Sequence, residues 1–105
     1  MTGWAFSGRD PGVPRAGISF EAQLTGEQAK RLAELMAEAR ATRPAGVLTA
    51  SLEFSDGRGR LVAIWRDEET LTRYLAQTPV PRGTELMRKV GAEPTVPRFE
   101  VLELG

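Results

Sequence analysis

The sequence contains no cysteine, no histidine and no asparagine. The absence of cysteine excludes disulfides, thiolate catalysis and cysteine-ligated metals. The absence of histidine removes the commonest general base and the commonest metal ligand. Any chemistry must therefore come from carboxylates, arginine, tyrosine, tryptophan, hydroxyl groups or the backbone. The acidic residues Asp67, Glu68 and Glu69 are better explained as the start of a helix than as metal ligands, so we expect no metal site.

Long hydrophobic runs and an excess of one charge are also missing. No segment approaches the ~20 apolar residues of a membrane span, and the first residues lack the apolar core of a signal peptide. Basic and acidic residues number 14 each, so the formal net charge is zero. A protein that binds nucleic-acid phosphates or anionic membranes normally has a basic excess. We expect a cytoplasmic protein with neither a nucleic-acid nor a membrane partner.

The chain has 105 residues, which is enough for one domain. Residues 1–15 are rich in glycine and proline and have no regular period, which is typical of an arm. Residues 16–105 carry the regular patterns and form the predicted domain. Within the arm, Trp4 and Phe6 either pack over an edge of the domain, belong to a disordered tail, or reach a pocket or a partner subunit.

Strand and helix patterns alternate along the predicted domain. Alternating apolar residues predict strands over 16–24, 47–54, 61–65 and 95–104. A capping box at Thr25 and Gln28 starts a helix that runs to about Thr42, and a second helical region follows Asp67 and is interrupted at residues 79–81. The βαββαβ order predicts an α+β, ferredoxin-like fold with a four-stranded antiparallel sheet. The first helix is expected to bury Ala29, Leu32, Ala33, Met36 and Ala39.

The second and third strands form a predicted hairpin around Asp56-Gly57. The register gives one wholly apolar face, made of Leu48, Ala50, Leu52, Phe54, Leu61, Ala63 and Trp65. The other face is mixed and carries Val47, Val62, Ile64 and, from the last strand, Leu102. Because two helices cover only one face of such a sheet, we expect the mixed face to meet a second copy in a homodimer.

The stretch 61–75 (LVAIWRDEETLTRYL) joins a strand directly to a helix. Trp65 ends the strand, Asp67 is the predicted N-cap, and Tyr74 lies on the inner side of the helix. We expect any small-molecule site at this corner. The same two aromatic residues also fit an ordinary core in which the tyrosine hydroxyl reaches water.

Residues 62–75 resemble the signature of the antibiotic-biosynthesis-monooxygenase-like family, the dimeric α+β barrels. In this signature a strand ends in tryptophan, an acidic pair opens the helix and an aromatic or histidine-type residue follows about two turns later. The resemblance extends over about residues 16–104 and includes the closing strand that starts at Arg98. It implies a dimer with a pocket in each subunit between sheet and helices. Some members oxygenate phenolic or anthrone-like compounds without metal or flavin, whereas others degrade haem with a histidine and an asparagine that this chain lacks.

The resemblance implies a cofactor-independent monooxygenase that acts on a small aromatic or quinol-like compound, with Tyr74 and Trp65 as catalytic residues. Tyr74 would donate a hydrogen bond to the substrate anion, and Trp65 would supply a stacking wall or an indole N–H. Arg82 or Arg88 either binds an anionic substrate or is a solvated surface residue. The alternative is a non-catalytic dimeric module that binds a small apolar ligand or a protein. The expected substrate-binding residues are Phe20, Ala50, Leu71, Leu75 and Met87.

Overall fold

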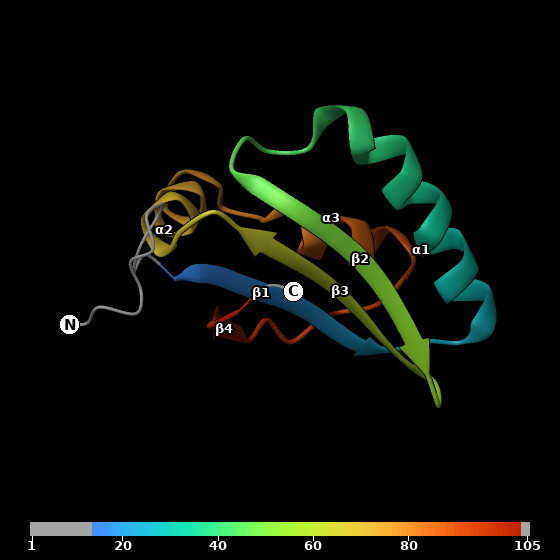
Figure 1. The fold of residues 1–105 in the computed structure, drawn as a ribbon. Coiled ribbons are helices and arrows are strands. Elements are labelled where there is room, and N and C mark those ends of the chain that lie inside the picture. The colour runs from blue at the N-terminus through green and yellow to red at the C-terminus, as the bar shows by residue number, and fades with distance from the viewer. Residues whose placement is uncertain (1–13, 104–105) are drawn as a thin grey trace.

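The computed structural model describes residues 14–103, which form an antiparallel sheet with helices on one face (Figure 1). The sheet order is β2-β3-β1-β4, which confirms the predicted ferredoxin-like α+β fold. Within these residues, no helix is long and apolar enough to cross a membrane. Trp4 and Phe6 lie outside the described residues. The elements are β1 (Arg15–Gln23), α1 (Gly26–Ala39), the 3-10 helix η2 (Arg40–Thr42), β2 (Val47–Ser55), β3 (Arg58–Trp65), α2 (Glu68–Gln77), α3 (Arg82–Lys89) and β4 (Arg98–Val101).

Helix α1 begins at the predicted capping box. The Gln28 N–H donates to Thr25 Oγ1 at 3.1 Å, and the Thr25 N–H donates to the Gln28 side-chain oxygen at 2.8 Å. The prediction for its inner side was wrong at one position, because Ala33 is exposed and Leu35 is buried. Successive residues of an α-helix are turned by about 100°, so Leu35, three residues after Leu32, shares its side whereas Ala33 does not.

The second helical region is divided into α2 and α3. The Asp67 carboxylate caps α2 by accepting a hydrogen bond from the Thr70 N–H at 2.7 Å. The segment Pro79–Pro81 separates the two helices. The last strand is shorter than predicted because Thr95 forms only an isolated bridge with Glu21 and regular pairing starts at Arg98.

The hairpin of β2 and β3 has the predicted register over most of its length. Leu52 pairs with Leu61 and Ala50 pairs with Ala63, across the two-residue turn Asp56-Gly57. A β-bulge between Val47 and Thr49 then shifts the register, so Val47 pairs with Trp65. The prediction that Val47 belongs to the mixed face was therefore wrong. The extra residue in a bulge reverses the alternation of the strand, and Val47 packs against the core instead.

The face of the sheet that carries the helices contains the core. Its fully or nearly fully buried side chains come from β1, from β3 and from all three α-helices. In Figure 1, α3 lies behind the sheet and α1 runs back along the side of β2 from the hairpin end. The sheet and these helices together enclose the site described below. The main buried residues are Ile18, Phe20, Leu32, Leu61, Trp65, Leu71, Leu86 and Met87.

The opposite face of the sheet is not covered by helices. Val62 is half-buried and Ile64 is buried on this face, and β4 contributes Phe99. The Phe99 ring lies over Gly17, where an added Cβ would stand only 2.0 Å from a ring carbon. Leu102 was predicted here, but it follows the end of β4 and is 82% exposed.

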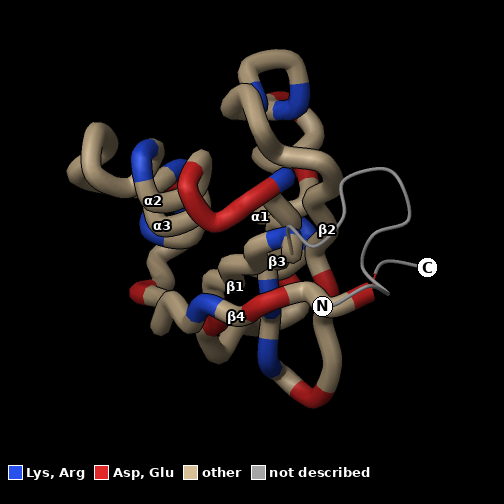
Figure 2. The backbone as a smooth tube through the Cα atoms, turned by 60° about the vertical axis from the view of Figure 1, so that its left-hand side comes forward, with Lys and Arg blue, Asp and Glu red and all other residues tan. Residues whose placement is uncertain are grey.

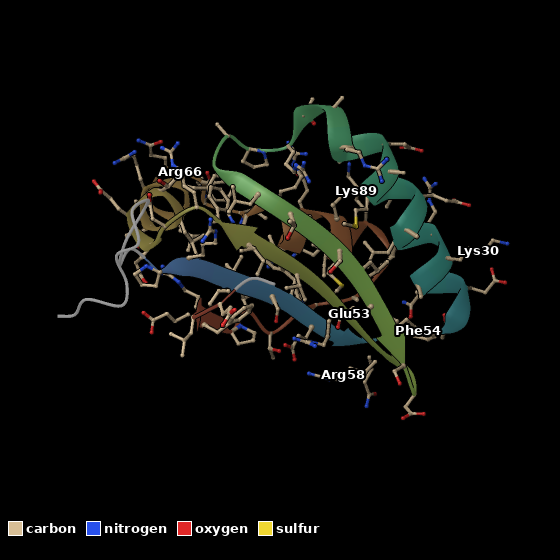
Figure 3. The ribbon with its side chains drawn as sticks, in the orientation of Figure 1. Lys30, Glu53, Phe54, Arg58, Arg66 and Lys89 are labelled. Atoms are coloured by element: carbon tan, nitrogen blue, oxygen red, sulfur yellow. The ribbon has the colours of Figure 1, made fainter. Side chains whose placement is uncertain are left out.

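A polar network lies on the same uncovered face. The Glu21 carboxylate accepts a hydrogen bond from the Ser19 hydroxyl at 2.5 Å, and it pairs with Arg58 at 3.3 Å and with Arg60 at 3.4 Å. Arg60 also pairs with Glu53 at 3.1 Å. The Ser19 hydrogen bond, followed by the two guanidinium groups, holds the pKa of Glu21 below its usual value. Figure 3 shows Glu53 and Arg58 towards the hairpin end of the sheet, with Arg66 at the opposite end of β3.

Candidate functional site

A cavity of about 110 Å³ lies between the core face of the sheet and the helices. A single buried water needs roughly 10–15 Å³ on this measure, so the cavity is large enough for several non-hydrogen atoms of a ligand. Strands β1, β2 and β3 form its floor, and α2, α3 and the end of α1 form its walls. Most of the lining is apolar. The volume of the cavity means that side chains do not fill the space at the corner between β3 and α2.

Trp65 forms one wall of this cavity and is only 3% exposed. It ends β3 and pairs with Ala16 on one side and Val47 on the other. The loop that precedes β2 approaches the Trp65 ring closely at Gly46, where φ is +101°. A Cβ at Gly46 would lie 2.6 Å from Thr70 Cγ2 and 3.2 Å from Trp65 Cε3. Only glycine permits this packing, which keeps the indole ring in place.

Tyr74 lies beside Trp65 in the same cavity. The two ring centroids are 4.9 Å apart and the ring planes are tilted by 38°. The Tyr74 hydroxyl oxygen accepts a hydrogen bond from the Arg82 backbone N–H at 2.9 Å, which ties α2 to the start of α3. Within residues 14–103, the hydroxyl proton has no acceptor in the structure. A phenol both donates and accepts, so this proton is available to a ligand in the cavity.

Five of the seven predicted site residues lie together around the cavity. Phe20, Ala50 and Leu71 line it with Trp65 and Tyr74.

The other two predicted residues, Leu75 and Met87, do not line the cavity. Met87 is fully buried in the core and Leu75 packs against the core cluster. Leu75 follows the lining residue Tyr74, and Met87 follows the lining residue Leu86. Successive side chains of a helix are turned by about 100°, so both point away from the cavity.

Three arginines that the sequence pattern did not place together lie at the edge of the cavity. Arg40 lies in η2, Arg43 is the residue that follows η2, and Arg82 lies in the first turn of α3. The signal that could have found the first two is Pro44, which ends the helix and favours a tight last turn. Arg88, the other predicted anion ligand, does not line the cavity. It makes two hydrogen bonds to Glu93, at 2.8 and 2.9 Å, which raise its own pKa and lower that of Glu93.

The arrangement combines an apolar cavity, one phenol donor and three cations. Among the lining residues within 14–103 there is no aspartate and no glutamate. The same part of the chain contains no group of three or more acidic side chains that could hold a metal ion. The pocket can therefore hold a flat apolar ring against Trp65 and stabilise negative charge on it, and it offers no carboxylate as a general base.

Comparisons with known proteins support the fold. No family model matches the chain, and no curated protein sequence matches it. Solved structures do. SnoaB, a cofactor-independent oxygenase from Streptomyces nogalater, aligns with a TM-score of 0.58 at 17% identity and covers 87% of this chain and 96% of its own. A candidate antibiotic biosynthesis monooxygenase from Deinococcus radiodurans gives 0.60 at 17% identity, covering 85% and 94%.

A protein of unknown function from Nitrosomonas europaea gives a TM-score of 0.62 at 16% identity, covering 89% of this chain and 94% of its own. At these identities the likeness establishes the fold. The chain has the fold of the antibiotic biosynthesis monooxygenase structures, as the resemblance of residues 62–75 predicted.

Proposed function

We propose that the protein is a cofactor-independent monooxygenase that oxidises a small aromatic or quinol-like compound beside Trp65 and Tyr74. The observation that carries the proposal is the open cavity of about 110 Å³ against this aromatic pair. An ordinary core would fill that space with side chains at close-packed density. The fold shared with SnoaB, a cofactor-independent oxygenase, adds support.

With an anthrone-like substrate, the proposed reaction converts an activated CH₂ group and O₂ into a carbonyl group and water. The substrate first loses a proton to solvent, since the lining offers no carboxylate base. The resulting anion passes one electron to O₂, and the radical pair combines to form a C–O bond. The peroxide anion takes a proton back from solvent, and the resulting hydroperoxide loses water to leave the carbonyl. Both oxygen atoms of O₂ are accounted for, one in the product and one in water.

The residues of the pocket would act on the anion. The Tyr74 hydroxyl would donate a hydrogen bond to its oxygen, in a water-poor site where such a bond is strong. The Trp65 ring would stack on the delocalised system and fix its orientation. The three arginines at the cavity edge would favour the anionic over the neutral form of the substrate.

Oxygen uptake with anthrone tests the proposal. We expect uptake above the spontaneous rate, with one anthraquinone formed for each O₂ consumed. Tyr74→Phe removes the proposed donor and should lower the enzymatic rate by about 10²-fold, the usual effect of losing one donor to a developing oxyanion. Trp65→Phe should lower it as well, and Arg31→Gln, on the exposed side of α1, serves as the matched control.

Two results would contradict the assignment. Uptake no faster than the spontaneous reaction, with anthraquinone still bound, would make the protein a non-catalytic binding module. Unchanged uptake in Tyr74→Phe and Trp65→Phe, with circular dichroism showing an intact fold, would remove these two residues from the reaction.

We also propose that the protein is a homodimer formed through the uncovered face of the sheet. Val62, Ile64 and Phe99 supply apolar surface there. The charges of Glu21, Arg58, Arg60 and Glu53 are paired with one another on the same face, which limits the cost of removing them from water. A second copy related by a two-fold axis would present the same surface in return.

A further inference from the structure

Ion pairing divides the arginines of the structure into two groups. Eleven arginines lie within residues 14–103, and eight of them form ion pairs with described carboxylates: Arg31, Arg58, Arg60, Arg66, Arg73, Arg82, Arg88 and Arg98. Arg15, Arg40 and Arg43 form none with described residues. Arg40 and Arg43 both line the cavity. Two of the three arginines without a described carboxylate partner therefore lie at the proposed site.

The 3-10 turn explains why these two side chains lie together. The Arg43 N–H donates to the Arg40 carbonyl oxygen at 3.3 Å, a contact between residues three apart. In a 3-10 turn, side chains at positions i and i+3 stand above one another on the same side. Both residues are exposed and both line the cavity, so they stand at its mouth rather than in its interior.

Arg82 completes the mouth from the other side. Its guanidinium donates to the Thr42 hydroxyl and to the Thr42 carbonyl, each at 3.1 Å. These two bonds join the start of α3 to η2 and hold the cation in place. Its contact with Glu85 is long, at 3.9 Å, and Glu85 is exposed. Arg82 is thus oriented by neutral oxygen atoms and keeps most of its positive charge available.

Polarity changes steeply from the mouth of the cavity to its interior. Trp65 and Leu71 are almost completely buried, whereas Arg40 and Arg43 are exposed. No acidic side chain within 14–103 lines the space between them. A ligand that matches this gradient is apolar at one end and anionic at the other.

We infer that the substrate is an aromatic carboxylic acid, whose rings enter the cavity and whose carboxylate is bound at the mouth by Arg40 and Arg43, with Arg82 beside them. A planar guanidinium forms two parallel hydrogen bonds to a carboxylate, and such charge-assisted bonds are the strong ones. The inference rests on the proposed aromatic site and adds the chemical class of its substrate. It concerns binding and is tested without turnover.

Calorimetric titration of the full chain with a matched pair of ligands tests the inference. The pair is an anthraquinone carboxylic acid and the corresponding carboxamide, which have almost the same shape and differ in charge. We expect the carboxylate to bind at least about tenfold more tightly at low salt, because hydrogen bonds to charged groups contribute more than neutral ones. The ratio should fall as salt screens the exposed guanidinium groups.

The double variant Arg40→Gln/Arg43→Gln should bring the two affinities close together and leave carboxamide binding unchanged. Arg31→Gln, which removes an exposed arginine of α1 that does not line the cavity, should keep the wild-type ratio. If Arg40 serves only the C-terminal dipole of α1, the double variant will melt earlier and still prefer the carboxylate, which overturns the inference.

Equal binding of the two compounds by the wild-type protein, or binding of neither, also overturns the inference. A preserved carboxylate preference in a protein that shows no oxygen uptake would overturn the monooxygenase proposal alone.

Discussion

The position of Trp65 depends on a single glycine, Gly46. Its φ of +101° lies in the region that favours glycine, and its Cα faces Thr70 and the indole ring at close range. Sequence periodicity predicted Trp65 and Tyr74 at this corner, because both are set by short-range patterns. It did not predict the role of Gly46, because the close approach of this loop residue to the Trp65 ring exists only in the folded chain.

Gly46→Ala should lower the free energy of unfolding by about 1–3 kcal/mol, because the new methyl group is strained by the positive φ and meets Thr70 Cγ2 at 2.6 Å. Urea denaturation measures the change. Gly26→Ala is the matched control, since a Cβ there meets nothing within 4 Å. It should be neutral or slightly stabilising. Equal stability of Gly46→Ala and wild type would contradict the packing described for Trp65.

At the scale of elements, local patterns predicted the hairpin register, the capping box of α1 and the N-cap of α2. They missed the bulge at Leu48 and the late start of regular pairing in β4, at Arg98. Each of these depends on contacts between elements. The bulge matters for the site, because it turns Val47 into the cavity.

The Glu21 network links β1 to β3 and predicts a pH dependence of stability. The pKa of Glu21 is lowered in the folded chain, so the ionised form favours folding. This contribution is complete above the unfolded-state pKa of about 4.3 and is lost as the pH falls below it towards the lower folded-state pKa. Glu21→Gln should therefore lower stability at neutral pH and flatten the acid limb of the stability curve.

Thermal melts between neutral pH and the acid limb measure this effect. Glu34→Gln, which breaks one exposed pair on α1, is the control and should leave the slope of the acid limb as it is in wild type. An acid limb of Glu21→Gln parallel to that of wild type would show that the Glu21 network does not contribute.

At the scale of the whole molecule, the element order was sufficient to predict the fold, whereas the cavity was implied only by the family resemblance and not by the residue pattern itself. The cavity exists because small residues face each other: Ala50 and Ala63 pair on the floor, and Ala39 and Gly83 lie on the walls. Whether such residues leave space depends on how neighbouring side chains interdigitate in three dimensions. Charges of both signs are interspersed along the chain (Figure 2), in keeping with its zero net charge.

The proposed dimer predicts a mass twice the 11.5 kDa of one chain by sedimentation at micromolar concentration. Val62→Glu places a charge on the uncovered face and should shift the protein to monomer, because an unpaired charge in an interface is costly. Val80→Glu, on the exposed linker between α2 and α3, should remain dimeric. A monomeric wild-type protein, or a Val62→Glu variant that stays dimeric, would contradict the proposed interface.

The central claim is that the cavity beside Trp65 binds an aromatic compound. The chain has two tryptophans, so Trp4→Phe leaves Trp65 as the single reporter. Titration of this variant with anthraquinone should quench its fluorescence to saturation. Adding Ala50→Phe, which fills the cavity from its floor, should weaken binding at least about tenfold, whereas Leu48→Phe on the same strand, outside the cavity, should not. Absence of saturable quenching, or equal quenching with Ala50→Phe, would contradict the claim.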